Sequence, residues 1–211
     1  MRLPKGPTTF ALGRLEKLCR AYGAPDETAA SLFEQLKVHY EGPSRHYHNS
    51  SHIDWMLQHL DQTKVKSDAI EFAIWFHDVI YDPTKDDNEK QSAKFFETLT
   101  SSFLPDQLRI RVIALILATD PRQSSSNPEE HLLCDIDLSI LGAPPAIYDQ
   151  YAINIKEEYD HVPSELFRKG RAAVLQNFLH SPIYQTKDFL ELEDPARANL
   201  KREISRLIKR E

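Results

Sequence analysis

The segment from Ser67 to Tyr81 is apolar on nearly every side of a helix, and it constrains the fold more than any other part of the chain. At 100° per residue, its apolar side chains leave only a narrow polar sector, which holds Glu71 and Asp78. A helix of this kind must be surrounded by other elements, because no face of it is suited to water. The segment therefore predicts a buried central helix over 67–81, with the rest of the chain packed around it.

The rest of the chain also has helical periodicity, and no segment alternates apolar and polar residues as a half-buried strand does. The 211 residues contain no Gly/Ser/Pro-rich linker that would divide them into two units. We therefore predict an all-α, single-domain helical bundle over residues 1–211. Two further helices are expected to end at Gly23 and Gly42, and three are expected to begin at Ser51, Asp86 and Pro105. Another is expected to run up to Gly142, and the last three are expected to cover about 144–160, 164–180 and 194–209.

The net charge of -6 is spread over mixed signs, with no basic stripe along the sequence. This pattern argues against a dedicated nucleic-acid-binding protein, although it allows a nucleotide as a substrate. Cys19 and Cys134 match no metal or redox spacing and are expected to be buried or half-buried thiols. No apolar stretch approaches the roughly 20 residues of a membrane span, and no apolar signal core opens the chain, so a cytoplasmic protein without membrane contact is expected.

His77 and Asp78 interrupt the apolar run of the central helix, where neither has an evident structural use. An unpaired carboxylate in such surroundings costs several kcal/mol, so buried charges are normally paired or bound to a metal. Imidazole and carboxylate groups also occur upstream and downstream, at His48, His52, Asp135 and Asp137. Without a thiolate, such a set suits Mn, Fe, Ni, Co or Zn at a hydrolytic centre better than it suits a structural zinc site.

Only one of Asp135 and Asp137 can face an ion, because residues two apart on a helix point about 200° away from each other. Asp137 falls among the apolar residues of its helix, and we predict that it is the ligand. Asp135 falls in the polar gap of the same helix and is expected to face solvent or to support a ligand from behind. A core salt bridge from Asp137 to Arg109 or Arg111 stays an alternative.

The two histidines of the segment 47–52 are four residues apart, yet we expect them to have different roles. The residues from Ser51 to Asp54 have the form of a capping box, so a helix is expected to begin there. His52 is then held rigidly at the helix start, which suits a metal ligand, whereas His48 precedes the helix, which suits an acid reaching into an open site. The remaining histidines are expected at the surface or in ordinary packing: His39, His46, His59, His131, His161 and His180.

The order of these residues resembles the HD superfamily of metal-dependent phosphohydrolases, in which a histidine is followed by a His-Asp pair on a buried helix and by a distant aspartate. The match looks closest to a group of predicted HD-domain proteins, and it rests on the segments Arg45 to His52, Phe76 to Tyr81, Asn88-Glu89, and Asp135 to Gly142. The resemblance covers about residues 40–207. It implies an HD-type helical bundle and a divalent metal held by His52, His77, Asp78 and Asp137.

The segment 47–52 is also similar to the metal motif of cyclic-nucleotide phosphodiesterases. In those enzymes the first histidine protonates the leaving oxygen and the second binds metal, so this resemblance assigns a general acid to His48 and a ligand to His52. One departure is Arg122, because close relatives tend to place a histidine three residues after the threonine that corresponds to Thr119. A single tightly held ion is therefore expected, with Asp120 as a weak substitute for the missing histidine.

Together these observations predict hydrolysis of a nucleotide or another small phosphate ester, as a monoesterase or a diesterase. A bound Mn, Fe, Ni, Co, Zn or Mg ion would activate water, and His48 would protonate the leaving group. Further residues expected to offset phosphate charge, or to orient water and ligands, are Arg45, Lys85, Arg122, Glu71 and Glu89. Two alternatives are an iron-dependent oxygenase on the same scaffold and a non-catalytic, metal-stabilised nucleotide-binding regulatory domain.

Overall fold

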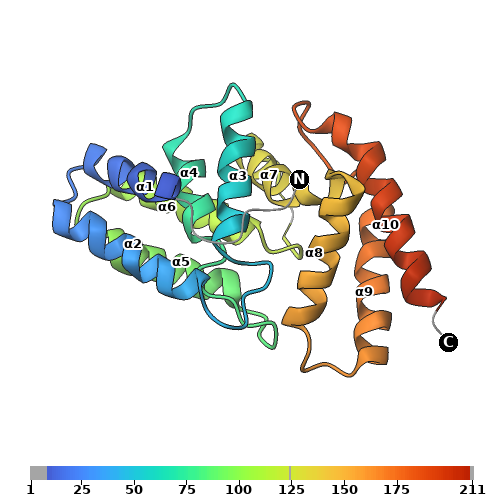
Figure 1. The fold of residues 1–211 in the computed structure, drawn as a ribbon. Helices are drawn as coiled ribbons and strands as arrows, with labels where there is room; N and C mark the ends of the chain where they lie inside the picture. The colour runs from blue at the N-terminus through green and yellow to red at the C-terminus, as the bar shows by residue number, and fades with distance from the viewer. Residues whose placement is uncertain (1–8, 124, 210–211) are drawn as a thin grey trace.

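The computed structural model describes residues 9–123 and 125–209, and helices are the only regular elements among them, which confirms the all-α prediction. Two short 3-10 helices, η1 (Ser139–Gly142) and η2 (Leu190–Leu192), accompany the α-helices of this described part. The α-helices, seen in Figure 1, are α1 (Thr9–Ala21), α2 (Asp26–Tyr40), α3 (Ser50–Gln62), α4 (Asp68–Phe76), α5 (Asn88–Thr100), α6 (Asp106–Ala118), α7 (Pro128–Leu138), α8 (Pro145–Glu158), α9 (Ser164–Leu179) and α10 (Glu193–Ile208).

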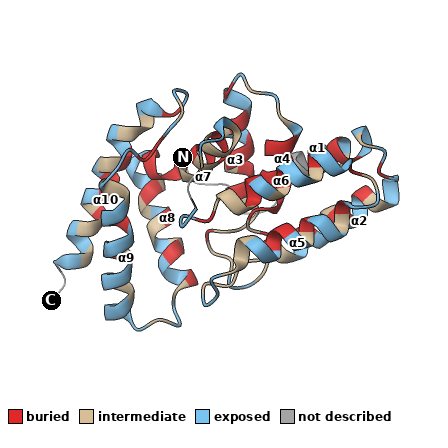
Figure 2. Ribbon diagram, turned by 180° about the vertical axis from the view of Figure 1, so that it is seen from behind, coloured by how far each residue is buried: buried red, intermediate tan, exposed pale blue. Residues whose placement is uncertain are grey.

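Helix α4 lies at the centre of the fold, as its apolar composition predicts. Apart from Glu71, every residue from Ala69 to Phe76 is buried. Helices α3, α5, α6 and α7 all pack against it. Phe76 meets Phe96 of α5 edge-on, with ring centroids 5.0 Å apart. Figure 2 shows the same pattern, with buried residues gathered on the inner helices and exposed residues on the outer faces.

Helix α4 is shorter than the sequence predicts, because it ends at Phe76 and not at Tyr81. The next residues turn away from the helix axis, and their main chain bonds to side chains from elsewhere. The carbonyls of Asp78 and Val79 accept hydrogen bonds from Arg45, while Ser92 Oγ bonds both to the N–H and to the carbonyl of Ile80. The N–H of His77 keeps the helical bond to the carbonyl of Ala73, but beyond His77 the helical pattern ends, so a helical projection does not hold for the residues that follow.

The helices form two groups on either side of α3 and α7 (Figure 1). The first group contains α1, α2, α4, α5 and α6, and the second contains α8, α9 and α10. Helix α7 continues as η1 up to Gly142, the residue at which the sequence predicts a stop. At this point η1 touches the C-terminal part of the chain: a Cβ atom on Gly142 would lie 2.7 Å from Leu192 Cβ, so a larger residue would force the two segments apart.

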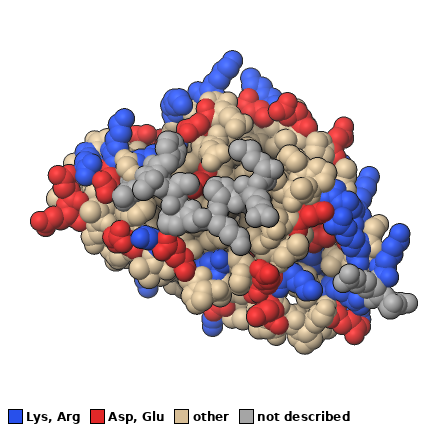
Figure 3. All heavy atoms as spheres, in the orientation of Figure 1, with Lys and Arg blue, Asp and Glu red and all other residues tan. Residues whose placement is uncertain are grey.

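In the described part of the chain, no helix is both long and apolar enough to cross a membrane. On the face shown in Figure 3, acidic and basic side chains lie close to one another along the periphery. The arginines of α9 and α10 are mostly paired with carboxylates of the protein itself: Arg171 with Glu203, Arg197 with Glu193, and Arg202 and Arg206 with Asp149. Much of the positive charge in this region is therefore neutralised within the fold.

Candidate metal centre

The first turn of α3 positions the first histidine of the site. Asn49 caps this helix, with its Oδ1 accepting the N–H of Ser51 at 2.9 Å, so α3 begins at Ser50, one residue before the predicted start. The predicted capping box is thus displaced by an asparagine cap. His52 lies in the first turn with its side chain 0% exposed, and the loop that carries His48 comes immediately before the cap.

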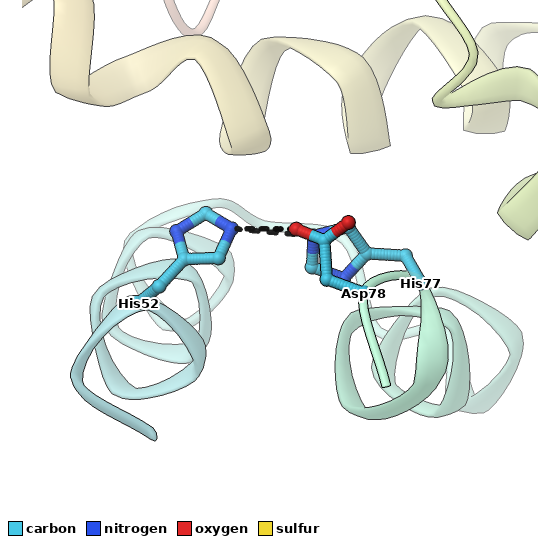
Figure 4. A group of neighbouring side chains, drawn as sticks. All are labelled: His52, His77 and Asp78. Carbon is cyan, nitrogen blue, oxygen red and sulfur yellow. Dashed lines mark hydrogen bonds and ion pairs between the residues drawn. The ribbon is translucent and has the colours of Figure 1, made fainter. Parts of the chain in front are cut away.

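Three side chains from two helices point toward one another at the centre of Figure 4. His52 comes from α3, and His77 and Asp78 come from the end of α4. His52 Nε2 lies 3.2 Å from His77 Nε2, and Asp78 Oδ2 lies 3.0 Å from His77 Nε2 and 3.7 Å from His52 Nε2. His77 is the C-cap residue of α4, and Asp78 follows it in the turn.

Asp137 joins these three residues from α7. Its Oδ1 lies 3.1 Å from His52 Nε2 and 3.7 Å from His77 Nε2. The alternative core salt bridge is absent among the described residues, because Arg109 pairs with Asp106 and Arg111 pairs with Glu129. The structure thus brings together all four residues that the sequence predicts as ligands.

The spacing of these atoms fits the donor set of one ion. For metal–ligand bonds of about 2.1 Å, adjacent donors lie roughly 3.0 Å apart on an octahedron and roughly 3.4 Å apart on a tetrahedron. Of the six pairs among the four donor atoms, the five that include an imidazole nitrogen are 3.0 to 3.7 Å apart. His52, His77 and Asp78 form the group whose donor atoms all lie within 4.8 Å of one another, and Asp137 approaches this group through the two imidazoles. Two imidazoles and two carboxylates also form a donor set typical of divalent transition metals.

The orientation of His77 supports the same interpretation. Its Nδ1 donates to the carbonyl of Ile74 at 3.0 Å, which leaves Nε2 to face the centre. Metal-binding histidines usually have their second nitrogen held in this way, because the bond fixes both the tautomer and the ring orientation. His52 differs, because its buried Nδ1 has no hydrogen-bond partner among the described residues.

The centre is closed on the imidazole side and open on the carboxylate side. The side chains of His52 and His77 are 0% and 1% exposed, whereas those of Asp78 and Asp137 are 17% and 26% exposed. The exposure of Asp137 corrects the prediction that it faces the core. Because the solvent reaches only the carboxylates, a ligand can approach an ion only from that side.

Burial and charge oppose each other in the pKa values of the centre. Burial favours the neutral form of His77. The negative charge of Asp78 and the hydrogen bond that Asp137 accepts outweigh burial, so the pKa of His77 is raised well above its ordinary value. At His52 burial prevails and lowers the pKa. The pKa values of Asp78 and Asp137 lie well below their usual range, because the imidazoles overcome the effect of burial. These interactions favour the protonated form of His77, and a cation bound at Nε2 would have to displace that proton.

His48 lies beside the centre and is paired with a carboxylate that sequence reasoning missed. Glu158, the last residue of α8, has a side chain that is 0% exposed, and its Oε2 lies 2.6 Å from His48 Nδ1. Its other oxygen accepts the main-chain N–H groups of Tyr47 and His48 at 2.7 and 2.9 Å. With Nδ1 committed to Glu158, Nε2 is the nitrogen left to serve a ligand.

The surroundings of His48 favour its protonated form. Burial lowers the pKa of the imidazole, but the charge of Asp78 and the hydrogen bond with Glu158 outweigh burial and raise the pKa. The ring also stacks on Tyr81, with centroids 4.0 Å apart and planes inclined by 27°. The His48 ring lies 6.0 Å from the His52 ring, so the imidazolium is a neighbour of the centre and not a member of its closely spaced donors.

Arg45 is held by the main chain, and this differs from the phosphate-binding role expected for it. Its guanidinium donates to the carbonyls of His48, Asp78 and Val79 at 2.9, 2.7 and 2.8 Å. These bonds tie the loop before α3 to the turn after α4. Arg45 therefore contacts the main chain around the centre, and the sequence gives no sign of this because the carbonyls of Asp78 and Val79 lie 33 and 34 residues away.

Asp135 is fully buried, which corrects the prediction that it lies on the solvent side of α7. Its carboxylate accepts hydrogen bonds from the main chain of Gln185 and from the N–H and hydroxyl of Thr186, the latter two at 2.7 and 2.6 Å. The C-terminal part of the chain thus covers the polar side of α7. Helical periodicity could not foresee this cover, because the covering segment lies 50 residues further along.

Glu71 lies outside the centre, which corrects the expectation that it orients water or a ligand. Both of its carboxylate oxygens pair with Arg14 of α1, at 2.8 Å each. Arg14 also binds Asp61 at 2.7 Å, so Glu71 belongs to a contact among α1, α3 and α4. Lys85 is exposed in the turn after Asp82 and has no described contact with the centre.

Glu89, Asp120 and Arg122 form a charged group next to the centre. Burial raises the pKa of Glu89, and the charges of Asp120 and Asp78 raise it further while Arg122 opposes them. The guanidinium of Arg122 donates hydrogen bonds to both carboxylate oxygens of Asp120, at 2.8 and 2.9 Å, and to the carbonyl of Asp86 at 2.6 Å. Because Asp120 is engaged in this way, it is poorly placed to replace a histidine ligand.

No protein-family model matches this sequence, and no curated protein matches it. The resemblance to the HD superfamily therefore stays a prediction that depends on the motifs around His52, His77-Asp78 and Asp137. The chemistry of the centre has to be inferred from its own residues.

Proposed function

We propose that this protein is a metal-dependent phosphohydrolase that acts on a nucleotide or another small phosphate ester. One observation carries the proposal: donor side chains from α3, the turn after α4 and α7 lie 3.0–3.7 Å from the imidazole nitrogens of His52 and His77, and His48, paired with the buried Glu158, lies beside them. The donors supply a site for one divalent ion. The pair supplies a proton donor, which a purely structural metal site does not need.

In this proposal one set of side chains binds the ion and a second pair, His48 and Glu158, supplies the proton. A divalent ion held by His52, His77, Asp78 and Asp137 would polarise a phosphoryl oxygen and acidify a water molecule. Glu158 fixes the imidazole of His48 through Nδ1 and favours its cationic form, so that the proton on Nε2 is available to a leaving oxygen. The open carboxylate side of the centre gives the substrate its approach.

The His48–Glu158 pair favours an enzyme over a non-catalytic regulatory domain. A histidine paired with a fully buried glutamate beside a donor set is costly for a fold that needs only a bound metal, since the carboxylate must be desolvated and held in place. The alternative of an iron-dependent oxygenase would require further histidine ligands, because such enzymes hold two irons. In the part of the chain that the structure describes, one group of three or more His, Cys, Asp or Glu side chains is spaced to hold an ion, namely His52, His77 and Asp78, so we propose a single-ion site.

The decisive experiment replaces His48 with alanine. The protein, purified without chelator, is first analysed for bound metal and screened with phosphate esters in the presence of Mn, Co, Ni, Fe, Zn or Mg. His48→Ala should keep its metal and lose roughly 10²–10⁴-fold in kcat, the usual contribution of a positioned general acid. The loss should be smaller for p-nitrophenyl phosphate, whose leaving group needs little protonation, than for an alkyl phosphate.

His46→Ala is the matched control, because His46 lies in the same loop and also pairs with a glutamate. Its Nδ1 is 3.2 Å from Glu157, but this pair is exposed. The control should retain metal and activity. Loss of metal in His48→Ala would show that His48 is a ligand. Wild-type rates of His48→Ala on every ester would show that His48 is not the general acid and would favour the non-catalytic, metal-stabilised regulatory domain.

A further inference from the structure

Arg45 lies where the loop of the proposed acid meets the turn of the metal ligands. One guanidinium nitrogen, Nη1, donates both to the carbonyl of His48 at 2.9 Å and to that of Asp78 at 2.7 Å. The other, Nη2, donates to the carbonyl of Val79 at 2.8 Å. The two segments are 30 residues apart in sequence, and a single side chain thus fixes their separation.

Aromatic rings hold the guanidinium on its faces. The central carbon of Arg45 lies 5.4 Å from the ring centroid of Tyr40 and 5.4 Å from that of Tyr81. Tyr40 is itself fixed, because its hydroxyl donates to the carbonyl of Trp75 in α4 at 3.0 Å. Tyr81 also stacks on the imidazole of His48. The same ring therefore contacts both the guanidinium and the acid.

Most of the donors of Arg45 are committed to the main chain. Both Nη1 protons and one Nη2 proton are already donated to carbonyls, so the Nη1–Nη2 pair cannot bind a phosphate in a bidentate way without breaking these bonds. Lysine could not take over these bonds, because its ammonium is a compact point charge and lacks the planar fork that reaches three carbonyls.

We propose that Arg45 is a positioning residue that holds the His48 loop and the Asp78 turn in register, so that the acid stands at a fixed distance from the metal ligands. The proposal rests on the proposed function only for its consequence in catalysis. The structural part, that one guanidinium couples the two segments, can be tested without any substrate.

The first arm of the test measures amide hydrogen exchange in Arg45→Lys. Exchange should accelerate together at the N–H of His48, which bonds to Glu158, and at the N–H groups of Val79 and Ile80, which bond to Phe76 and Ser92. Arg14→Lys is the matched control, because Arg14 is also half-buried and multiply bonded but belongs to the contact between α1 and Glu71. It should leave these three amides unchanged.

The second arm is a double-mutant cycle between Arg45→Lys and His48→Ala, read at a temperature where both variants are folded. If Arg45 acts through His48, Arg45→Lys should lower kcat more than it raises KM, should affect alkyl phosphates more than p-nitrophenyl phosphate, and should cause little further loss in the His48→Ala background. Arg45→Met serves as a second variant if the lysine protein is unstable.

Two results would overturn the proposal. If exchange rises in only one of the two segments, or in neither, the guanidinium does not couple them. If the double mutant loses activity additively and KM rises for every ester, Arg45 binds the phosphate directly. A wild-type protein that hydrolyses no phosphate ester would overturn the proposed function instead, and the exchange arm would still decide whether Arg45 couples the segments.

Discussion

The N-terminal and C-terminal groups of helices are held together by different interactions. Around α4 the contacts are almost entirely apolar, with residues such as Phe72 and Phe96 fully buried. Around α8, α9 and α10 the interior contains polar networks: Glu203 is buried, pairs with Arg171 at 2.9 Å and accepts the hydroxyl of Tyr148. Asn199 is also buried, and its amide donates to the carbonyls of Leu141 and Ala143 at 2.8 Å each.

This difference corresponds to a division of roles at the candidate centre. The turn after α4, in the N-terminal group, supplies His77 and Asp78, and α3, between the two groups, supplies His52; of these three, the two imidazoles are buried. The C-terminal group supplies Glu158, which holds His48, and the segment that binds Asp135. The proposed ligands thus come from the N-terminal group and from the two helices between the groups, while the C-terminal group supplies contacts that fix His48 and Asp135. Three substitutions test this division, from the largest expected effect to the smallest.

Asp135→Asn should have the largest effect, on the stability of the fold. The asparagine would turn an amide group toward the N–H groups of Gln185 and Thr186, so buried donors would lose their charged acceptor. We expect a loss of about 3 kcal/mol in the free energy of unfolding, measured by urea denaturation. Asp149→Asn, at a partly exposed ion pair, should cost less than about 1 kcal/mol. Equal losses in the two variants would mean that the contact between Asp135 and residues 185–186 stabilises the fold no more than a partly exposed ion pair does.

Asp137→Asn should weaken metal binding and leave the fold largely intact. Removing one of four donors is expected to lower the metal affinity by at least about 100-fold, since even residues behind the ligands contribute 10–100-fold. Competition with a chromophoric chelator measures this affinity, and Asp106→Asn is an exposed control. Affinity in the wild-type protein should also rise with pH, because the cation displaces the proton of His77, whose pKa is raised. Unchanged affinity in Asp137→Asn would remove this residue from the centre.

Glu158→Gln should have the smallest of the three effects, a shift in pH dependence. The pKa of His48 is raised, against burial, by Asp78 and Glu158, and neutral glutamine would remove part of that support. The alkaline limb of the kcat profile should therefore move to lower pH, while the metal content stays the same. A profile that does not move would show that Glu158 only holds the loop.

The same pair predicts a window of pH in which it stabilises the fold. His48 has a raised pKa, so its contribution is complete below its unfolded value of about 6.5 and is lost as the pH rises through its folded value. Glu158 has a lowered pKa, so its contribution is complete above about 4.3 and is lost as the pH falls through its folded value. The stability difference between the wild-type protein and Glu158→Gln should thus be largest between these two values.

The sequence predicts the all-α class and the set of converging residues well, and the reasons are physical. His77 and Asp78 stand out because polar groups in an apolar run need a partner. Helical projection selects Asp137 over Asp135, but for an incorrect reason, since Asp135 is the more deeply buried of the two. Projection describes one helix alone, and a covering segment 50 residues away changes which side is buried.

Glu158 escaped sequence reasoning because glutamates at the end of a helix usually face water. One signal could have found it: Glu157 and Glu158 both lie in the last turn of α8, where the helix dipole disfavours negative charge. Carboxylates in such a position need another source of stabilisation. For Glu158 that source is His48 and two main-chain N–H groups, 110 and 111 residues away.

The early end of α4 also affects which changes of length the chain can tolerate. Surface loops usually accept insertions, and the polar loop at 121–127 between α6 and α7 is a natural place for them. The turn after Phe76 is different, because Arg45, Ser92 and Asn88 each bind its main chain at set positions. One added residue in this turn would shift His77 or Asp78 relative to His52 and Asp137 without altering any of these side chains. This turn is therefore free to vary in composition at its exposed positions, but its number of residues is fixed.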